Sequence, residues 1–136
     1  MSTLKKVVLI DDDQVNNFVC ESIIKNEDFA EEVCSFEWAE DALNHLKDMA
    51  TASPGNFPEL IFLDINMPGM DGWQFMDEYK KFPEDLTSKC CLFMLSSAVD
   101  RKDIITAKNL LDVKEFFSKP LSTEILNIIK EDYIQQ

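Results

Sequence analysis

Short apolar runs alternate along this chain with longer stretches in which apolar residues recur at helical spacing. The clearest runs are residues 7–10, 60–63 and 90–95, and shorter ones lie near residues 33–36 and 115–118. Continuous apolar runs of this length are typical of strands buried on both faces, and their alternation with helical stretches is typical of βαβ units. The pattern therefore predicts five βα units and an α/β fold whose parallel sheet is covered by helices on both faces.

The stretches between the runs predict the helices and loops. After the first run, apolar and small residues recur at helical intervals, which predicts a helix; they are Val15, Phe18, Val19, Ser22 and Ile23. Further helices are predicted over residues 39–49, 72–82, 100–111 and 121–133, and Pro83 helps to end the third of these five. Residues 51–59 contain Ser-Pro-Gly-Asn and a second proline, which predicts a surface loop of about nine residues, longer than is usual.

The length and composition fit one globular domain. The chain has 136 residues, of which 46% are hydrophobic, and no linker or low-complexity segment divides it. We therefore expect a single domain over residues 1–136 with no output domain attached. Its four cysteines form no CxxC pair, so we expect free thiols rather than a zinc site.

The charge limits the partners. The formal net charge is −13, which opposes direct binding to nucleic acid or to an anionic membrane surface and favours cationic partners such as metal ions. No stretch approaches the roughly 18 apolar residues of a membrane span, and the N-terminus lacks the apolar core of a secretory signal. We expect a cytoplasmic protein.

Polar residues follow the predicted strands at the point where each ends. In an open parallel sheet, ligands bind outside these carboxyl ends, where the strand order reverses. The residues concerned are Asp11, Asp12, Asp13, Asp64, Ser96, Ser97 and Lys119. Carboxylates brought so close would repel one another unless a cation bound among them, and oxygen ligands suit Mg²⁺.

Carboxylates, a magnesium ion and one lysine in the same cleft point to phosphoryl transfer. Asp64 is the best candidate nucleophile because it stands at the tip of the central apolar run and a carboxylate can form an aspartyl phosphate. Lys119 could reach either Asp64 or its phosphoryl oxygens, and Ser96 could donate a hydrogen bond to the same oxygens. The catalytic candidates are therefore Asp64, Ser96 and Lys119.

These motifs, taken together, closely resemble those of receiver domains of bacterial two-component systems. The resemblance rests on the run LDINMPGMDG at residues 63–72, the Asp11-Asp12 pair, Ser96 and Lys119-Pro120, and it extends over residues 5–133. It implies a flavodoxin-like (βα)5 fold with strand order 2-1-3-4-5, for which a receiver protein is a standard example. It also implies a phosphoacceptor signalling protein rather than an enzyme, phosphorylated by a sensor histidine kinase or a histidine phosphotransfer protein and acting on a downstream protein that the sequence does not identify.

The resemblance also assigns roles to residues. Asp11, Asp12, Asp64 and the backbone carbonyl of Asn66 would hold Mg²⁺. Ser96 and Phe116 would form the conformational switch. The chain departs from the family pattern at Asp112-Val113, where many receivers have Gly-Ala, and in the long loop over residues 51–59, which leaves the geometry at one edge of the fold open.

Plainer interpretations exist for several residues. The acids at positions 11–13 could cap the first helix, and Asp13 is expected to do so. Lys119 could be an ordinary loop lysine, and Phe116 a core aromatic. His45 is expected to be solvated, and Asp71-Gly72 to form a turn without chemistry.

Two other functions compete with the receiver hypothesis. Hydrolases of the haloacid dehalogenase type also phosphorylate an Asp after an apolar run, but they carry a second Asp two residues on, where this chain has Asn66. A receiver-like module that binds a partner without being phosphorylated would be indicated by loss of an acid or of the lysine. Both kinds of residue are present.

Overall fold

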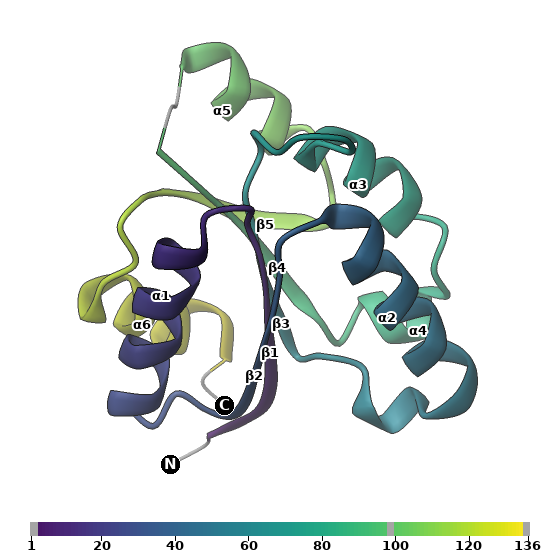
Figure 1. Cartoon of the computed structure of the whole chain (residues 1–136), viewed down its shortest axis with the longest axis horizontal. Coiled ribbons are helices and arrows are strands. Elements are labelled where there is room, and N and C mark those ends of the chain that lie inside the picture. The colour runs from purple at the N-terminus through teal and green to yellow at the C-terminus, as the bar shows by residue number, and fades with distance from the viewer. Residues whose placement is uncertain (1–2, 98–99, 135–136) are drawn as a thin grey trace.

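The centre of the molecule is a five-stranded parallel sheet with the order β2-β1-β3-β4-β5 (Figure 1). The computed structural model describes residues 3–97 and 100–134. The α/β class and the strand order predicted from the sequence are both confirmed. The strands are β1 (Leu4–Ile10), β2 (Ala30–Phe36), β3 (Leu60–Leu63), β4 (Cys91–Ser96) and β5 (Val113–Ser118).

Helices cover both faces of the sheet, as Figure 1 shows. α1 (Gln14–Asn26) and α6 (Thr123–Ile129) pack on one face, and α2 (Ala39–Ala52), α3 (Gly72–Tyr79) and α5 (Arg101–Lys108) on the other. The remaining elements are short, namely a 3₁₀ turn η1 (Pro54–Asn56), the helix α4 (Glu84–Thr87) and a π-helical turn η2 (Lys130–Ile134).

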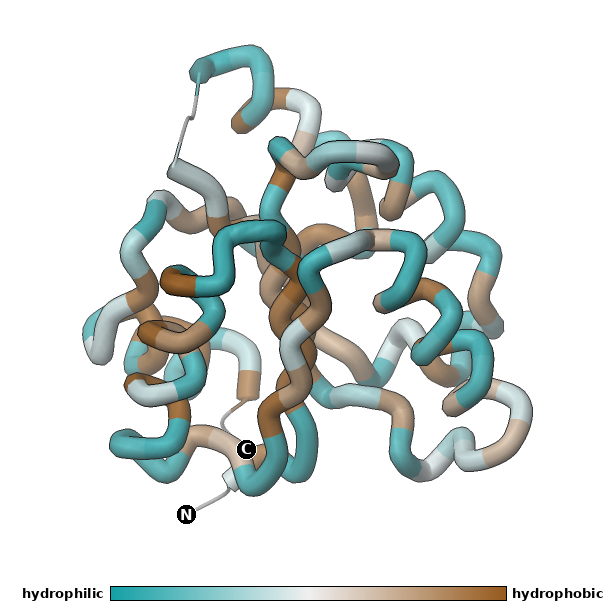
Figure 2. Tube along the Cα trace, viewed as in Figure 1, coloured by the Kyte–Doolittle hydropathy of each residue, from teal (hydrophilic) through white to brown (hydrophobic). Residues whose placement is uncertain are grey.

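The sheet separates two hydrophobic cores because side chains alternate between its faces along each strand. On β1, Val8 and Ile10 enter the core beneath α2 and α3, whereas Val7 and Leu9 enter the core beneath α1 and α6. Figure 2 shows mostly hydrophobic central strands between helices along which hydrophobic and hydrophilic residues alternate. A sheet buried on both faces leaves only the ends of its strands open to a ligand.

Helix α1 begins where the sequence places it but buries a different face. Asp13 caps it as predicted, since its side chain accepts hydrogen bonds from the first turn. Three of the apolar residues that predict the helix are exposed, Val15 at 71%, Phe18 at 70% and Val19 at 40%, whereas Ile23 is half-buried against the core. The buried residues are instead Asn17, Cys20 and Ile24. An apolar face therefore lies on the surface of α1.

The connections differ from their predicted form in three places. α2 continues to Ala52, and the expected loop at residues 51–59 is shortened by η1 and anchored by the buried side chain of Phe57. The third predicted helix ends at Tyr79, and α4 forms directly after Pro83. Strand β5 begins at Val113 without a preceding glycine, and the β4–β5 register shifts between Leu92 and Phe93.

The prediction that His45 is solvated is wrong. The His45 side chain is half-buried, and the centroid of its ring lies 5.1 Å from that of the Phe36 ring. Its Nε2 lies 2.7 Å from the Lys6 ammonium nitrogen. Lys6 itself is only 7% exposed, because it points from β1 into the space beneath α2. His45 is recruited because a buried ammonium needs an acceptor, a requirement that the spacing of α2 does not reveal.

The cysteines are free thiols, as predicted; Cys20 and Cys90 are buried and Cys34 and Cys91 half-buried. Burial raises the pKa of each of the four thiols above its ordinary value, which lowers the share of the reactive thiolate form at neutral pH. Among the residues that the structure describes, no helix has the length and apolar character needed to cross a membrane.

Candidate functional site

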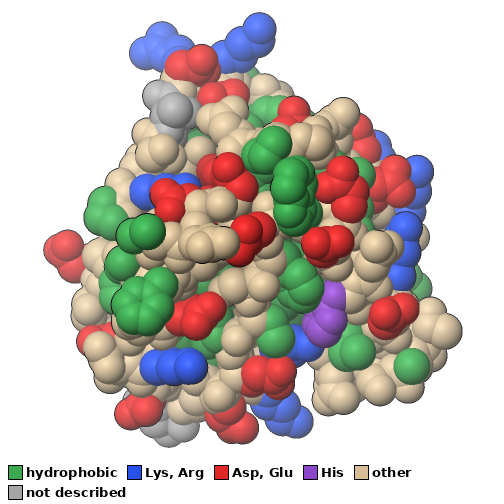
Figure 3. Space-filling model, in the orientation of Figure 1, with side chains coloured by type: hydrophobic (Ala, Val, Ile, Leu, Met, Phe, Trp, Pro, Cys, Tyr) green, Lys and Arg blue, Asp and Glu red, His purple; other side chains and the backbone are tan. Residues whose placement is uncertain are grey.

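Three carboxylates meet at the carboxyl end of the sheet. Asp11 and Asp12 follow β1, and Asp64 follows β3, which pairs with β1. One carboxylate oxygen of each residue lies within 4.8 Å of the others. Asp11 and Asp64 are buried and Asp12 is exposed, so the cluster opens to solvent on one side. Acidic side chains are also frequent on the surrounding surface (Figure 3).

Asp64 is held firmly at the end of β3. Its backbone N–H donates to the carbonyl of Ile10 over 2.9 Å, and its side chain is buried. Its Oδ1 accepts two hydrogen bonds, one from the backbone N–H of Ile65 at 2.9 Å and one from the Ser96 hydroxyl at 2.8 Å. The second oxygen, Oδ2, faces Lys119 at 3.6 Å. The carboxylate is thus fixed by one oxygen and presents the other.

Gly72 explains how the chain after Asp64 stays so close to it. The backbone N–H of Gly72 donates to the carbonyl of Ile65 over 2.8 Å. A Cβ at position 72 would lie 2.8 Å from both the Asp64 carbonyl oxygen and the Ile65 Cα, a distance that no side chain tolerates. Asp71, predicted to form a turn, caps α3 in a capping box with Gln74. Gly72 was not singled out from the sequence as part of the site.

Lys119 binds a different acid from the one emphasised by the sequence. Its ammonium lies 2.6 Å from Asp11 Oδ2 and 3.6 Å from Asp64 Oδ2. Burial acts to lower the pKa of Lys119, but its bond to Asp11 and the charges of Asp11 and Asp64 outweigh burial and raise the pKa. The lysine is therefore a fixed positive charge shared unequally between two carboxylates.

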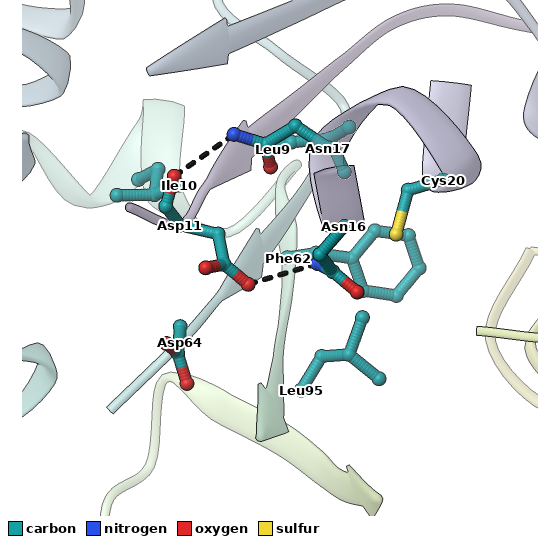
Figure 4. A pocket seen from close by; sticks show the side chains of 9 residues that line it. All are labelled: Leu9, Ile10, Asp11, Asn16, Asn17, Cys20, Phe62, Asp64 and Leu95. Atoms are coloured by element: carbon teal, nitrogen blue, oxygen red, sulfur yellow. Dashed lines mark hydrogen bonds between the residues drawn. The ribbon is translucent and has the colours of Figure 1, made fainter. Parts of the chain in front are cut away.

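Asp11 is the most heavily bonded member of the cluster. Besides Lys119, its carboxylate accepts hydrogen bonds from the backbone N–H of Asp13 and the side-chain amide of Asn16, and its carbonyl accepts one from the side-chain amide of Asn17 (Figure 4). Burial raises the pKa of Asp11, and the bonds from Lys119 and Asp13 offset this only in part. Neither asparagine was singled out from the sequence, where amides on a predicted helix carry no distinctive signal.

The family model of the response regulator receiver domain matches residues 7–130. The chain belongs to the receiver domain family. A comparison with curated proteins gave no match. The strand order β2-β1-β3-β4-β5 and the acids at the carboxyl end of the sheet agree with the family match.

Solved structures place this receiver among others of its kind. It is similar to a two-component response regulator from Cytophaga hutchinsonii, with 34% identity, a TM-score of 0.88 and 96% of each chain covered. It is 26% identical to a response regulator receiver protein from Dyadobacter fermentans, with a TM-score of 0.81 over 93% of this chain and 96% of the other. It is also 26% identical to the cyanobacterial phytochrome response regulator RcpA, whose structure is of the phosphorylated form, with a TM-score of 0.75 over 95% of this chain and 91% of the other.

Two further residues to which the sequence assigned a role, Asn66 and Phe116, lie outside the group of contacts around Asp11, Asp64 and Lys119. Asn66 is exposed, two residues beyond Asp64 in the loop before α3. Phe116 is half-buried on β5 and lines a groove against α5 together with Ile104 and Ala107. Ser97, also noted in the sequence, follows Ser96 at an exposed position, so only Ser96 reaches Asp64.

The donor set of the receiver fits a hard divalent cation. Three carboxylates share the site with one lysine, which leaves a surplus of negative charge when all are ionised. All the ligands are oxygens, and the exposed side at Asp12 leaves room for water, as Mg²⁺ requires. Crowded carboxylates repel one another, and a bound cation would relieve that repulsion.

Proposed function

We propose that this receiver accepts a phosphoryl group on Asp64 from a phosphohistidine of a histidine kinase or histidine phosphotransfer protein, with Mg²⁺ as the cofactor. Asp11, Asp12, Asp64 and the backbone carbonyl of Asn66 would hold the ion. When bound, it would neutralise the phosphoryl oxygens as the group is transferred. The protein would then act as a signalling switch and catalyse only its own phosphorylation and dephosphorylation.

The observation that carries this proposal is the unequal use of the two Asp64 oxygens. Oδ1 accepts hydrogen bonds from Ile65 and Ser96, whereas Oδ2 faces the Lys119 ammonium at 3.6 Å. We assign Oδ2 as the nucleophile. It attacks phosphorus as the P–N bond of the phosphohistidine breaks, and the bonding electrons stay on the imidazole nitrogen of the donor. The product is an aspartyl phosphate whose new oxygens lie within reach of Lys119.

Relatives support the chemistry. RcpA, at 26% identity, has been crystallised as the phosphorylated protein. The receiver domain of the Arabidopsis thaliana histidine kinase CKI1, which has the same fold at 22% identity, has been crystallised with Mg²⁺. Phosphorylation and Mg²⁺ binding are described for those proteins, and we extend them to this chain because its own acids and lysine meet at the end of the sheet.

The exposed face of α1 supports a protein donor. Any donor that delivers a phosphoryl group to Asp64 must cover the open side of the cluster, and α1 starts there, one residue after its cap Asp13. Val15 and Phe18, both exposed, offer that donor an apolar contact. We expect Phe18→Ser to slow transfer from a phosphorylated protein donor and to leave uptake from acetyl phosphate unchanged.

We further propose that Ser96 and Phe116 relay phosphorylation to a downstream protein. The Ser96 hydroxyl already bonds Asp64 Oδ1 over 2.8 Å, so a phosphoryl group would need to redirect it only slightly. The relay would therefore change partner affinity modestly, since a ligand shifts an equilibrium only by its differential affinity for the two states. Fluorine NMR of labelled Phe116 with and without beryllofluoride tests this; an unchanged ring environment would rule out the switch.

The main test is intact-mass measurement after incubation with acetyl phosphate and Mg²⁺. The wild type should gain one phosphoryl group and Asp64→Asn none, while Asp77→Asn, an exposed acid on α3 paired with Lys80, should behave as wild type. Uptake by Asp64→Asn at the wild-type rate would refute the assignment. Turnover of many acetyl phosphate molecules would instead indicate a hydrolase, and no uptake by the wild type would indicate a passive binding module.

A further inference from the structure

Two consecutive asparagines in the first turn of α1 hold Asp11 at two points. The Asn16 side-chain amide donates to Asp11 Oδ2 over 2.8 Å, and the Asn17 side-chain amide donates to the Asp11 carbonyl over the same distance. Figure 4 shows both amides reaching from the helix toward the end of β1. Because the helix start is already fixed by its Asp13 cap, these amides are anchored to a rigid element.

The hydrogen bonds of Asp11 show what Asn16 contributes. A carboxylate accepts at about four positions, two on each oxygen. Oδ1 takes the backbone N–H of Asp13, and Oδ2 takes both Asn16 and Lys119. The two donors to Oδ2 differ in how far they can move, because the Lys119 side chain is long and flexible whereas the Asn16 side chain is short. If Lys119 leaves for a phosphoryl group, Asn16 is the side-chain donor that still holds Oδ2.

We propose that Asn16 is a positioning residue for the metal ion, acting through Asp11. Asn16 and Lys119 both bond Asp11 Oδ2. By holding this oxygen in place, Asn16 keeps it directed toward the cation when Lys119 moves away. This inference rests on the proposed function, since it assumes that the acid cluster binds Mg²⁺. Groups that orient a metal ligand from outside the coordination sphere commonly change metal affinity by about 10- to 100-fold when they are removed.

The alternative is that Asn16 merely stabilises the helix. Three observations oppose it. The cap is already supplied by Asp13, which bonds the backbone N–H groups of Val15 and Asn16. Asparagine is a poor helix former in itself. Its side-chain amide is directed to a buried carboxylate, whereas the amide of Gln14 on the same turn bonds the exposed Glu37.

The experiment compares Asn16→Leu with wild type and with Gln14→Leu. The latter is a matched control, because it removes an amide from the same turn without touching Asp11. Calorimetric titration with MgCl₂ gives the affinity, and melting curves with and without Mg²⁺ give its contribution to stability. We expect Asn16→Leu to bind Mg²⁺ about 10-fold more weakly or worse and Gln14→Leu to bind as wild type.

The melting curves separate positioning from a structural role. Positioning predicts that the gain in melting temperature on adding Mg²⁺ shrinks in Asn16→Leu, because that gain depends on affinity. A merely structural role predicts that both melting temperatures fall equally while the gain is unchanged, and this result would overturn the inference. Asn16→Ala removes the same amide without added bulk and must agree, so the conclusion holds if the leucine variant does not fold.

The wild-type titration separates failure of the proposed Mg²⁺-dependent function from failure of the inference about Asn16. If the wild type binds no Mg²⁺, the metal-dependent function fails and the inference fails with it. If the wild type binds Mg²⁺ and both Asn16 variants bind it equally well, only the inference about Asn16 is refuted.

Discussion

The two ends of the sheet each hold a lysine that is largely removed from solvent, buried Lys6 and half-buried Lys119, and the two lysines have opposite kinds of partner. At the amino end, Lys6 donates to the neutral ring of His45 at 2.7 Å. At the carboxyl end, Lys119 lies 2.6 Å from Asp11 and 3.6 Å from Asp64, with Asp12 in the same cluster. One lysine is satisfied by a base without charge, whereas the other is outnumbered by acids.

This difference shows how one fold holds a lysine against a neutral acceptor at one end and within a cluster of acids at the other. A neutral acceptor satisfies a buried ammonium without creating any demand for another ion. A group of carboxylates around one ammonium leaves negative charge uncompensated, and such a site gains stability from a divalent cation or from loss of a carboxylate. We therefore expect a metal or phosphoryl site where buried charges are left unbalanced, and not wherever a charge is buried.

The largest expected effect comes from removing each lysine in turn. Lys119→Met leaves Asp11 buried without its cation and should destabilise the fold by about 3 kcal/mol in metal-free buffer. Lys6→Met removes a charge whose partner is neutral and should change stability by less than about 1 kcal/mol. Urea unfolding measures both, and added Mg²⁺ should restore part of the loss in Lys119→Met. Equal losses in the two variants would break the contrast between the ends.

The second test concerns how tightly each end is packed. Gly72→Ala, at the carboxyl end, would force its Cβ to 2.8 Å from the backbone of Asp64 and Ile65, and should cost about 1–3 kcal/mol of unfolding free energy. Gly55→Ala is the control, because a Cβ at that position in η1 has no heavy atom within 4 Å. Its stability should stay within about 0.5 kcal/mol of wild type. If both alanine variants unfold alike, tight packing around Asp64 is not what Gly72 provides.

A smaller effect is expected on reducing the excess of acid. Asp12→Ala removes an exposed carboxylate that repels Asp11 and Asp64, so the melting temperature in metal-free buffer should rise slightly. The gain on adding Mg²⁺ should shrink, since one ligand is lost. Asp11 is unsuited to this test, because its removal also leaves Lys119 without its nearest partner. Melting curves that ignore Mg²⁺ in the wild type would show that the cluster is not a metal site.

The smallest effect is a pH dependence at the amino end. Burial lowers the pKa of His45, the Lys6 charge lowers it further, and the charges of Asp48 and Glu32 oppose the shift only in part. Because the folded pKa lies below the unfolded value, the unfolded state takes up the proton first, and stability falls as the pH drops below about 6.5.

His45→Gln removes this titration and keeps an acceptor for Lys6. His45 is the chain's single histidine, so the difference between the two proteins reports on it alone. Wild type should therefore lose more unfolding free energy than His45→Gln between pH 7 and pH 5.5, measured by urea denaturation. Parallel losses would show that the imidazole titrates alike in the folded and unfolded chain.

The fold was largely predictable because its sheet is buried on both faces. Continuous apolar runs such as residues 60–63 have no other stable place in a small protein, and each ends where the chain turns to a helix. The orientation of α1 was not predictable. Its exposed apolar residues and its buried residues Asn17, Cys20 and Ile24 both recur at helical spacing, so spacing alone does not select the inner face. On that face Asn17 gains a hydrogen bond to the Asp11 carbonyl, and Cys20 and Ile24 enter the core.

The sequence predicted which residues form the candidate site better than it predicted which of them bond to one another. Acids and a lysine at the ends of strands must meet, because parallel strands present these ends at one edge. The sequence could not show that Lys119 lies closer to Asp11 than to Asp64, since that depends on about 1 Å in the path of a flexible side chain. Gly72 and Asn16 were missed for a similar reason: close approach and amide direction are properties of coordinates.

The position of Gly72 has a practical consequence for spectroscopy. The next residue is Trp73, half-buried in the first turn of α3, so an indole ring is attached to the segment that touches the Asp64 backbone. The chain's other tryptophan, Trp38, is 47% exposed. Replacing Trp38 with phenylalanine would leave Trp73 as the single tryptophan. Excited selectively at the red edge of its absorption, Trp73 would report occupancy of the Asp64 site in unlabelled protein and in real time.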